Sequence, residues 1–545
     1  VPPSEVSLIN NPTCIDMSDT NQGNSAPDMK LFWGCFIALI TTSFGFITRM
    51  FLLDDPTITS DLLGLDDAEV GIFKGIQIWP FAISIIGFSL IIDKVGYKFS
   101  MIFAAVCQII WAIMGITGLS VAADNPQLAK DLLFWGGLIL ALGNGTVEAF
   151  INPVVATIFD KDKTKWLNIL HAGWPGGLVI AGIITIMMGG ADWGLKLGII
   201  IIPALIYLVM LIKCKFPVQE RVSAGVSYKD MLKEFGFGGA AVVALLIFLQ
   251  LDQTFPGNST AFILICGAMA VGLGVYTMSL GRPLMFLLIL IMTPLATTEI
   301  GTDGWISGIM AGIVEFHAGW ILVYTSVIMM VLRFFAGPIV HSMGPVKLLI
   351  ASSVLAIVGL KALSGVNGVA MIFGAATLYA LGKTFFWPTM LGIVSEQTPK
   401  GGALTLNSVS GIGMLAVGVL GFPYIGALQE KKAVSEVAGI EAAATVPGLL
   451  EKGQVTPSAL ENKDIYYGTI SYQTWKTGEL DKLLEGQSEE TIKAINTAKD
   501  NSGQKALGDM AIFPGIMLVA YIMIFLYFRS KGGYKPLDLS GDGGH

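Results

Sequence analysis

The sequence predicts an all-α polytopic membrane protein, and three observations support this fold class. Only 13% of the 545 residues are charged, against roughly 25% in soluble domains, while 53% are hydrophobic. Many apolar runs reach the length of about 20 residues that a helix needs to cross a bilayer. Glycine is abundant, at 65 residues, as expected where helices pack closely in lipid. A soluble protein with so few charges would expose a large apolar surface to water, so soluble multidomain enzymes and disordered chains are excluded.

Fourteen apolar runs are predicted to span the membrane, and charged or Gly/Pro-containing stretches separate them. Twelve of these runs are expected to form two six-helix bundles, and two more lie between the bundles as extra spans. The predicted spans are 31–53, 70–92, 99–121, 132–157, 167–189, 194–212, 236–252, 260–279, 284–301, 317–340, 346–364, 368–394, 402–426 and 510–528.

Lysine and arginine residues set the predicted orientation, because short cytoplasmic loops are rich in them. With the N-terminus inside, about half of the 33 basic residues fall at inner helix ends or loops, and only Lys130 and Lys196 fall on short outer loops. Both termini are therefore predicted to be cytoplasmic, with the chain in the plasma (inner) membrane. The predicted domains are a cytoplasmic N-terminal tail (1–29), an N-terminal six-helix bundle (30–213), a cytoplasmic linker with the two extra helices (214–283), the first five helices of a C-terminal bundle (284–427), an outer insert (428–509), the last transmembrane helix (510–528) and a cytoplasmic tail (529–545).

The connection at 428–509 is too long and too charged to be an ordinary loop. A partial helical stripe indicates a small, mostly helical cap on the outer side. This cap is interpreted either as a packed decoration or as a lid or docking element for a protein partner. The stripe consists of Leu480, Leu483, Leu484, Ile492 and Ile495.

The chain repeats short patterns in its two halves. The stretch Glu148-Ala-Phe-Ile-Asn-Pro153 ends one predicted span, and Lys383-Thr-Phe-Phe-Trp-Pro388 ends another with the same spacing from charge to proline. The loop Asp93-Lys-Val-Gly-Tyr-Lys98 is echoed by His341-Ser-Met-Gly-Pro-Val-Lys347. Paired halves around a site at the middle of the membrane are the architecture of secondary transporters, so this architecture is predicted here.

The first of these loops resembles the inner-loop signature of the major facilitator superfamily, in which an acid and basic residues latch the two halves together. In the second half His341 stands where the acid would be, so the copy is degenerate. The resemblance implies two six-helix bundles that expose a central cavity to alternate sides of the membrane. The inner-gate residues that it implies are Asp93, Lys94, Gly96, Lys98 and Arg333.

A narrower resemblance is to the fucose/galactose/glucose–proton symporter branch of that superfamily. Glu148 with Asn152 and Pro153 is similar to the E-x-x-x-N-P pattern in helix 4 of the branch. The run Glu299–Trp305 resembles the acidic end of its helix 7, and Phe386–Thr389 resembles an aromatic-Pro-Thr run in its helix 10. The chain departs from the branch in three respects, which are Arg49 in place of an acid in helix 1, fourteen spans, and the outer insert.

Charges inside the membrane single out candidate functional residues, because each costs roughly 2.5–3.5 kcal/mol even on a lenient scale. Lys74 and Lys361 lie near outer helix ends, where their side chains can reach the interface. Arg333 lies late in its span and is expected to pin that helix to the inner latch. The remaining four lie on the helices that line the cavity in the superfamily, and they are Arg49, Glu148, Glu299 and Lys383.

The repeat places Glu148 and Lys383 at equivalent positions, so they are expected to face each other across the cavity. Such a pair is either a structural ion pair or a switch that makes and breaks. Because a low-dielectric cavity favours the neutral form of a carboxyl, Glu148 is predicted to carry a proton, with Lys383 as its partner. Glu299 is the second candidate for proton coupling, or else it closes an outer gate with Arg49.

Polar and aromatic side chains near the cavity helices are candidates for binding a sugar, since sugars take planar hydrogen-bonding groups and aromatic faces. Each is weak alone, because asparagine and tryptophan in membrane helices more often serve helix packing or anchor the interface. The candidates are Asn144, Asn152, Asn168, His171, Trp174, Gln77, Trp79, Trp305, Trp387, Thr389 and Asn407.

The predicted function is a secondary active transporter that moves a small polar solute, most simply a sugar, by proton symport. A facilitator or exporter of the same superfamily and a non-transporting sensor or assembly subunit are the alternatives. No phosphate-binding loop, metal-ligand pattern or nucleophile motif is present. We therefore expect no enzyme activity, no cofactor and no metal, and we do not expect ATP to drive transport. The net charge of −7 argues against nucleic-acid binding, and the polar first 29 residues show no leader pattern.

Overall fold

Long apolar runs fold into helices in lipid because the backbone N–H and C=O groups must be paired within the segment. The computed structural model describes residues 28–539 except 56, 66, 312, 315, 466, 467 and 477. It has 13 helices that are long and apolar enough to cross a membrane, or 14 when one bent pair counts as a span. The predicted all-α membrane class is confirmed. The predicted tail at 1–29 lies almost wholly outside the described residues.

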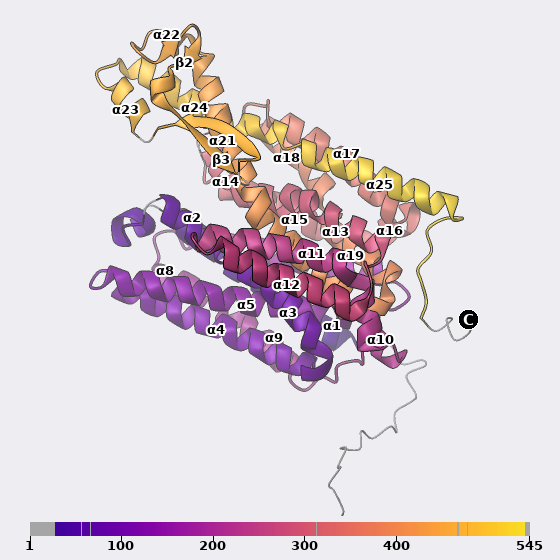
Figure 1. Ribbon diagram of the computed structural model, residues 1–545. Helices are drawn as coiled ribbons and strands as arrows, with labels where there is room; N and C mark the ends of the chain where they lie inside the picture. Colours follow the sequence, from indigo (N-terminus) through magenta and orange to yellow (C-terminus); the bar gives the residue numbers. More distant parts are fainter. Residues whose placement is uncertain are drawn as a thin grey trace, which may run out of the picture.

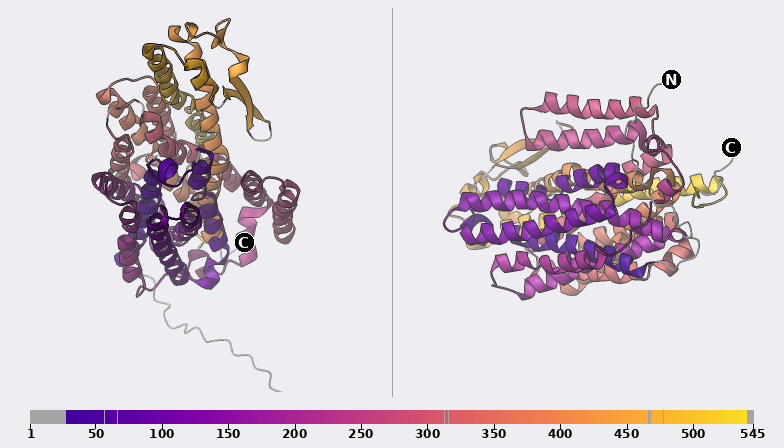
Figure 2. Two further views of the ribbon diagram at one scale, coloured as in Figure 1. Left: turned by 90° about the vertical axis from the view of Figure 1, so that its left-hand side faces the viewer. Right: turned by 90° about the horizontal axis from the view of Figure 1, so that it is seen from below.

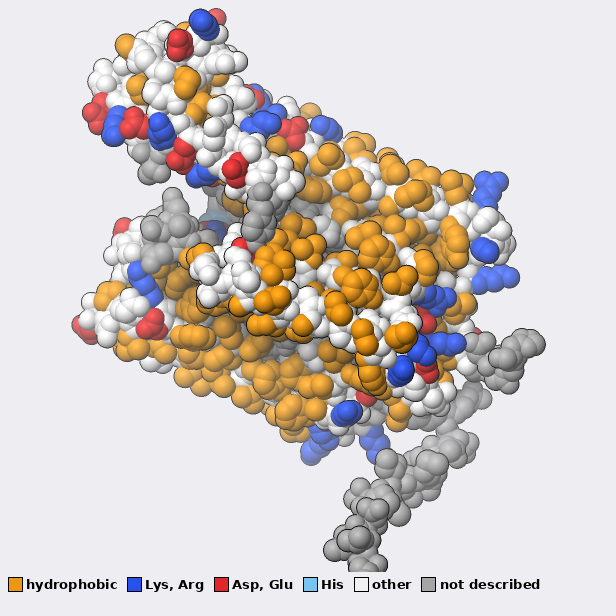
Figure 3. Space-filling model, viewed as in Figure 1, with side chains coloured by type: hydrophobic (Ala, Val, Ile, Leu, Met, Phe, Trp, Pro, Cys, Tyr) orange, Lys and Arg blue, Asp and Glu red, His pale blue; other side chains and the backbone are white. Residues whose placement is uncertain are grey.

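The helices run side by side between two ends of the molecule, and a smaller cap stands on one end (Figure 1). The end where α1 begins and α25 finishes is the terminal face, and the opposite end is the cap face. A broad hydrophobic surface covers the bundle, while Lys and Arg side chains gather at the terminal face and on the cap (Figure 3). This belt with charged ends matches a protein surrounded by a bilayer.

Six spans form the half nearer the N-terminus, the N-half. Three of them consist of two shorter helices, and the break in one of these follows Gly75 and precedes Pro80. The elements are α1 (Met29–Leu53), the π-helical turn η1 (Thr57–Leu62), α2 (Asp67–Gly75), α3 (Trp79–Val95), α4 (Tyr97–Val121), α5 (Pro126–Ile158), α6 (Lys163–Leu170), α7 (Gly173–Met187), α8 (Trp193–Gly198) and α9 (Ile201–Leu211).

Six more spans form the C-half, and its helices are interrupted more often. A π-helical turn interrupts the first span, a 67° bend follows α15, and a break separates α18 from α19. The elements are α13 (Pro283–Ala296), η2 (Thr297–Gly301), α14 (Thr302–Ala311), α15 (Gly319–Phe334), α16 (Ala336–Met343), α17 (Pro345–Leu363), α18 (Val369–Lys383), α19 (Phe386–Gln397), η3 (Pro399–Gly401), α20 (Gly402–Ala416), η4 (Val417–Gly421), α21 (Phe422–Ala438), α24 (Glu489–Asp509) and α25 (Ile512–Ser530).

The two extra spans lie as a pair at the edge of the bundle (Figure 2). The short helix α10 (Glu220–Ser223) leads into α11 (Tyr228–Thr254), which packs on α20 and α13, and α12 (Ser259–Thr277) packs on α11. A Cβ on Gly281, at φ 93°, would lie 2.4 Å from the carbonyl oxygen of Phe235, so only glycine lets the chain approach this closely.

The backbone confirms the loop repeat that the sequence shows. Gly96 separates α3 from α4 with φ 82° and ψ 153°, and Gly344 separates α16 from α17 with φ 72° and ψ 157°. Both values lie in a region that favours glycine, so each copy makes the same sharp turn. The helical copies differ, because α5 passes Glu148 and Pro153 without a break whereas Lys383 ends α18.

The cap begins where α21 and α24 project beyond the bundle. Its helices are joined by α22 (Glu441–Ala444) and α23 (Glu479–Leu484), and it also contains two antiparallel hairpins that were not predicted from the sequence. The strands are β1 (Leu450–Glu451), β2 (Gln454–Val455), β3 (Leu460–Ile465) and β4 (Ile470–Trp475). The strand β3 is mostly polar and lacks a clear two-residue period, so its sequence gives little strand signal. A small apolar core that includes Leu480, Leu484 and Ile495 holds the cap together.

Candidate functional site

The two halves meet in the middle of the bundle along a buried layer of polar side chains. Helices α5 and α6–α7 of the N-half supply some of them, and η2, α14, α15, α18, α19 and α20 of the C-half supply the others. All are buried in the molecule. This central polar cluster consists of Glu148, Asn152, Asn168, His171, Glu299, Asp303, Arg333, Lys383, Trp387, Thr389 and Asn407.

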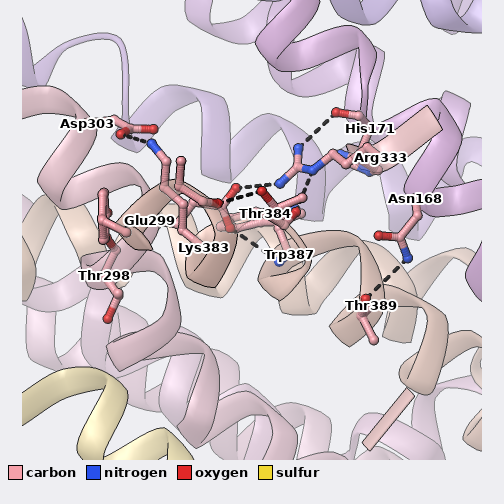
Figure 4. Close-up of polar contacts among 12 residues, drawn as sticks. Asn168, His171, Thr298, Glu299, Asp303, Arg333, Lys383, Thr384, Trp387 and Thr389 are labelled. Carbon is pink, nitrogen blue, oxygen red and sulfur yellow. Dashed lines mark hydrogen bonds and ion pairs between the residues drawn. The ribbon is translucent and has the colours of Figure 1, made fainter. Parts of the chain in front are cut away.

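Two ion pairs lie within the C-half part of the cluster. Arg333 Nη2 lies 2.8 Å from Glu299 Oε1, and the Lys383 ammonium pairs with Asp303 (Figure 4). Arg333 is 1% exposed and Lys383 is fully buried. A charge buried this deeply is strongly unfavourable without a partner, so each member of a pair depends on the other.

Breaks in the helices supply the further partners of the Glu299–Arg333 pair. A helix that ends leaves carbonyl groups free, and a helix that begins leaves N–H groups free. Arg333 Nε donates to the carbonyl of Thr384, in the break between α18 and α19, at 2.7 Å. The backbone N–H of Trp387, at the start of α19, donates to Glu299 Oε2 at 3.3 Å. Backbone groups at the break between α18 and α19 therefore form hydrogen bonds with both Arg333 and Glu299.

Arg333 also reaches across to the N-half. Its Nη1 donates to the backbone carbonyl of His171 at 2.9 Å, in the break between α6 and α7. Asn168 Nδ2 makes a second contact between the halves, donating to Thr389 Oγ1 at 3.2 Å. Movement of the halves apart at this level would break both hydrogen bonds.

Glu148 has a different environment from the other two acids of the cluster. Its Oε2 accepts a 2.8 Å hydrogen bond from Asn152 Nδ2, and the same amide nitrogen lies 3.4 Å from Asn407 Oδ1 in the other half. His171 Nε2 donates to Asn152 Oδ1 at 3.0 Å. Asn407 Nδ2 donates in turn to the carbonyl of Ala149 at 2.8 Å. Among the described residues, no cation lies within ion-pair distance of Glu148.

The predicted pairing of Glu148 with Lys383 is wrong, because Lys383 pairs with Asp303 inside its own half. Asp303 was missed because it lies just beyond the predicted span 284–301. The sequence did contain a signal for Asp303. It lies four residues after Glu299, and this spacing places the two acids on one face of a helix.

The expected positions of the two arginines are also wrong. Arg333 lies in the central cluster and not at an inner latch. Arg49 lies inside the N-half, where it donates to the carbonyl of Phe73 and lies 5.9 Å from the centre of the Trp111 ring. Arg49 therefore does not pair with Glu299, whose carboxylate is bound by Arg333.

Several predicted binding residues lie outside the cluster. Asn144 Oδ1 accepts from Gln108 at 2.9 Å within the N-half, and Gln77 Nε2 donates to Met50 Sδ at 3.2 Å. The three tryptophans among them are partly buried and pack on apolar neighbours, as the packing alternative expects. These are Trp79, Trp174 and Trp305.

The halves are fastened together at the terminal face. Glu396 at the end of α19 accepts hydrogen bonds from the backbone N–H and hydroxyl of Thr164, at the start of α6. The chain after α25 reinforces this contact, because the Tyr534 hydroxyl donates to Glu396 Oε2 at 2.7 Å. Neither Glu396 nor Tyr534 was predicted, since both lie outside the apolar spans where charges are conspicuous.

The loop motif lies at the same face, and its acid forms an ion pair. Asp93 binds Arg221 of α10, a partner that was not predicted from the sequence. Lys94 lies over the ring of Tyr228 at 5.7 Å, and Lys98 is exposed. In the second copy His341 Nε2 lies 3.2 Å from Asp162 Oδ1 of the N-half, so the degenerate copy contacts the opposite half.

A pocket of about 640 Å³ opens between the halves at the cap face, where Figure 3 shows the surface hollowed below the cap. Asp55, Trp193 and His317 are among its lining residues, and Trp193 Nε1 donates to Asp55 Oδ2 at 2.9 Å. One turn deeper, Ile47 and Val323 both pack against α7 at Gly182. The two halves therefore make an apolar contact next to the pocket.

Comparisons with known proteins identify the fold. No protein-family model and no curated protein matches the sequence. A bacterial homologue of the human lysosomal transporter Spinster matches in structure with a TM-score of 0.57 and 14% identity, over 94% of this chain and 100% of that one. The proton:xylose symporter XylE of E. coli matches with a TM-score of 0.53 and 13% identity, over 73% and 88%. The human organic anion transporter MFSD10 matches with a TM-score of 0.52 and 11% identity, over 91% and 100%.

The protein is therefore a multi-pass membrane protein with the fold of major facilitator superfamily transporters, as its loop motif predicted. The proteins that it resembles are transporters and not enzymes. At identities this low, the likeness establishes the fold and not the solute.

Proposed function

We propose that the protein is a proton-coupled secondary transporter of a small, neutral polar solute, and that Glu148 carries the proton. The observation that carries this proposal is an imbalance of charge in the central polar cluster. Glu299 and Asp303 each have a cation, whereas Glu148 has none among the described residues. A buried carboxylate without a cation is strongly unfavourable, and binding a proton removes its charge.

The groups around Glu148 fit this role. Asn152 on the same helix, His171 at the α6–α7 break and Asn407 on α20 form the hydrogen-bonded surroundings described above. Helices α1, α3, α4, α6 and α20 pack on α5, and among the described residues none of them supplies an ion pair to Glu148. Arg333 acts on Glu148 electrostatically without forming an ion pair with it, because Glu299 binds Arg333.

Arg333 is proposed as the group that senses the proton. It binds Glu299 in its own half and the carbonyl of His171 in the other half. When Glu148 loses its proton, its negative charge competes for Arg333 and weakens those contacts. While Glu148 is protonated, Glu299 holds Arg333 in place, so the second carrier predicted from the sequence is assigned a positioning role.

The cluster favours a solute without net negative charge. Both cations of the central polar cluster, Arg333 and Lys383, are neutralised by acids, so an anion would find no free positive charge among them. The amides of Asn152, Asn168 and Asn407 and the hydroxyl of Thr389 supply donors and acceptors between the halves, as a sugar requires. A membrane potential of 100 mV supplies about 2.3 kcal/mol per proton, which sustains a roughly fiftyfold gradient of a neutral solute.

Transport by proteoliposomes tests the proposal. The full-length protein is reconstituted and offered radiolabelled sugars, nucleosides and amino acids, with and without an inward proton gradient. For the solute that accumulates, Glu148→Gln is expected to abolish accumulation driven by the gradient while counterflow exchange persists. The matched control is Glu441→Gln, which removes an exposed acid of the cap. Gradient-driven accumulation by Glu148→Gln at the wild-type level would overturn the proposal.

We also propose that the terminal face is cytoplasmic and that the protein resides in the plasma membrane. Loops rich in lysine and arginine lie at that face, as the positive-inside rule requires. The cap at 428–509 is then outside, where a protein partner could reach it. Labelling of Lys213→Cys and of Glu441→Cys by an impermeant maleimide in whole cells, on a cysteine-free background, tests this orientation. Only Glu441→Cys is expected to react before the membrane is permeabilised.

A further inference from the structure

A second cavity, of about 460 Å³, opens at the terminal face between the loop that joins α16 to α17 and the end of α25. One wall carries the aromatic side chains of Phe525, Phe528 and Tyr534, and the other is formed by residues 343–347. It lies apart from the central polar cluster and from the pocket at the cap face. Neither the fold nor the proposed transport of a polar solute accounts for it.

Two cations line this cavity from different helices. Lys347 comes from the first turn of α17, and Arg529 comes from the last turn of α25. In the described part of the chain, neither side chain has an ion pair with an acid, and Lys347 lies only over the ring of Phe525, at 5.9 Å. The positive end of the α17 dipole points to the same place. The cavity therefore attracts an anion.

The position of the cavity along α25 indicates what kind of anion fits. The preceding turns of α25 expose Met523, Leu526 and Tyr527, which is the pattern of a helix face in contact with lipid chains. Arg529 follows immediately, where this apolar surface ends. The cavity thus joins apolar walls to a cationic rim at the level where lipid headgroups lie.

We propose that this cavity binds an anionic phospholipid. The phosphate lies between Lys347 and Arg529, and the glycerol and first acyl carbons lie against Phe525 and Phe528. A soluble phosphate compound would use the cations and leave the aromatic walls exposed to water, whereas a phospholipid uses both surfaces. Basic pockets between transmembrane helices are known to favour anionic lipid headgroups.

Lipid retention by the purified protein tests this site. The full-length protein is reconstituted in nanodiscs of phosphatidylcholine with graded phosphatidylglycerol, and the lipids that it retains are counted by native mass spectrometry. We expect phosphatidylglycerol to be retained in preference to phosphatidylcholine. Each of Lys347→Gln and Arg529→Gln is expected to weaken this binding about fivefold, and the double variant about thirtyfold. The single variants give an answer even if the double variant does not fold.

The matched control is the double variant Lys213→Gln with Lys215→Gln. Both lysines are exposed at the end of α9 on the same face, and neither lines this cavity. This control removes the same charge and is expected to retain phosphatidylglycerol as the wild type does. Equal retention of both lipids by the wild type, wild-type binding by the double variant at Lys347 and Arg529, or an equal loss in the control would each overturn the proposal. Displacement of the lipid by inorganic phosphate would identify a soluble anion as the ligand and would also overturn it.

Discussion

The two halves share a repeat, yet they treat buried charge in opposite ways. The C-half brings two acids and two cations to the interface and pairs all four within itself. The N-half brings only Glu148, which accepts a hydrogen bond from the Asn152 amide, while Arg49, a buried cation of this half, lies away from the interface cluster. A half with paired charges can move as one body without exposing an ion. The half with the single carboxyl changes its charge only by gaining or losing a proton.

Breaking a pair in the C-half is expected to have the largest effect on stability. Arg333→Leu leaves Glu299 buried and without its cation, which costs about 3–5 kcal/mol in the free energy of unfolding. The double variant Arg333→Leu with Glu299→Leu removes both charges and is expected to recover most of that loss. Denaturant unfolding of the protein in detergent, followed by tryptophan fluorescence, measures both. A double variant no more stable than Arg333→Leu would show that the pair is not the source of the effect.

Loosening the contact at the terminal face is expected to have the next largest effect. Glu396→Gln weakens charge-assisted hydrogen bonds from Thr164 and Tyr534, worth about 1.5–3 kcal/mol, and so favours separation of the halves there. The rate of maleimide labelling of Ala156→Cys, on a cysteine-free background, is expected to rise at least tenfold. Glu489→Gln in the cap is the control and should leave the rate unchanged. No rise in labelling would mean that Glu396 does not hold this face closed.

A hydrogen bond inside the N-half should matter less. Tyr207→Phe removes the 2.9 Å hydrogen bond from the tyrosine hydroxyl to Gln108 Oε1 and leaves the ring in place. Hydrogen bonds between membrane helices average about 0.6 kcal/mol, so a loss of that size in unfolding free energy is expected. A loss above about 2 kcal/mol would show that the N-half depends on its polar core as strongly as the C-half depends on its ion pairs.

The smallest effect on stability is expected at the proposed proton carrier. Glu148→Gln strands no cation and keeps an acceptor for Asn152, so the unfolding free energy should stay within about 0.5 kcal/mol of the wild type. The matched variant Glu299→Gln strands Arg333 and should cost several times more. If the two variants are equally destabilised, Glu148 is ionised and compensated in the folded protein, and the contrast between the halves fails.

The fold was largely predictable, because span length, charge depletion and the loop motif each report on a property that lipid imposes on every segment. Most charged residues in the membrane were predictable for the same reason, since each stands out in an apolar run, but Asp303 at the end of its run was not. Their pairing was not. It depends on the break after Lys383 and on the π-helical turn around Glu299, and neither follows from the hydrophobic period.

Residues outside the spans were the hardest to predict. Asp303, Arg221 and Glu396 lie at or beyond span ends, where a charge is ordinary and carries no signal in a single sequence. The hairpins of the cap were missed for a related reason, because short polar strands lack the alternation that identifies a buried strand. A charge stands out in a sequence when it lies within an apolar span. A charge outside the spans does not stand out, even where it forms an important contact.

The cap has a mechanical consequence through its connections to the bundle. Its helix α21 continues the helical run of α20, and α24 leads directly into α25, so both of its supports belong to the C-half. Gln504 fastens its base to the carbonyls of Leu363 and Val366, again in the C-half. A rotation of the C-half against the N-half would therefore move the tip of the cap further than it moves the bundle. One fluorophore there and another on the N-half would report the movements of the proposed transport cycle without touching the central polar cluster.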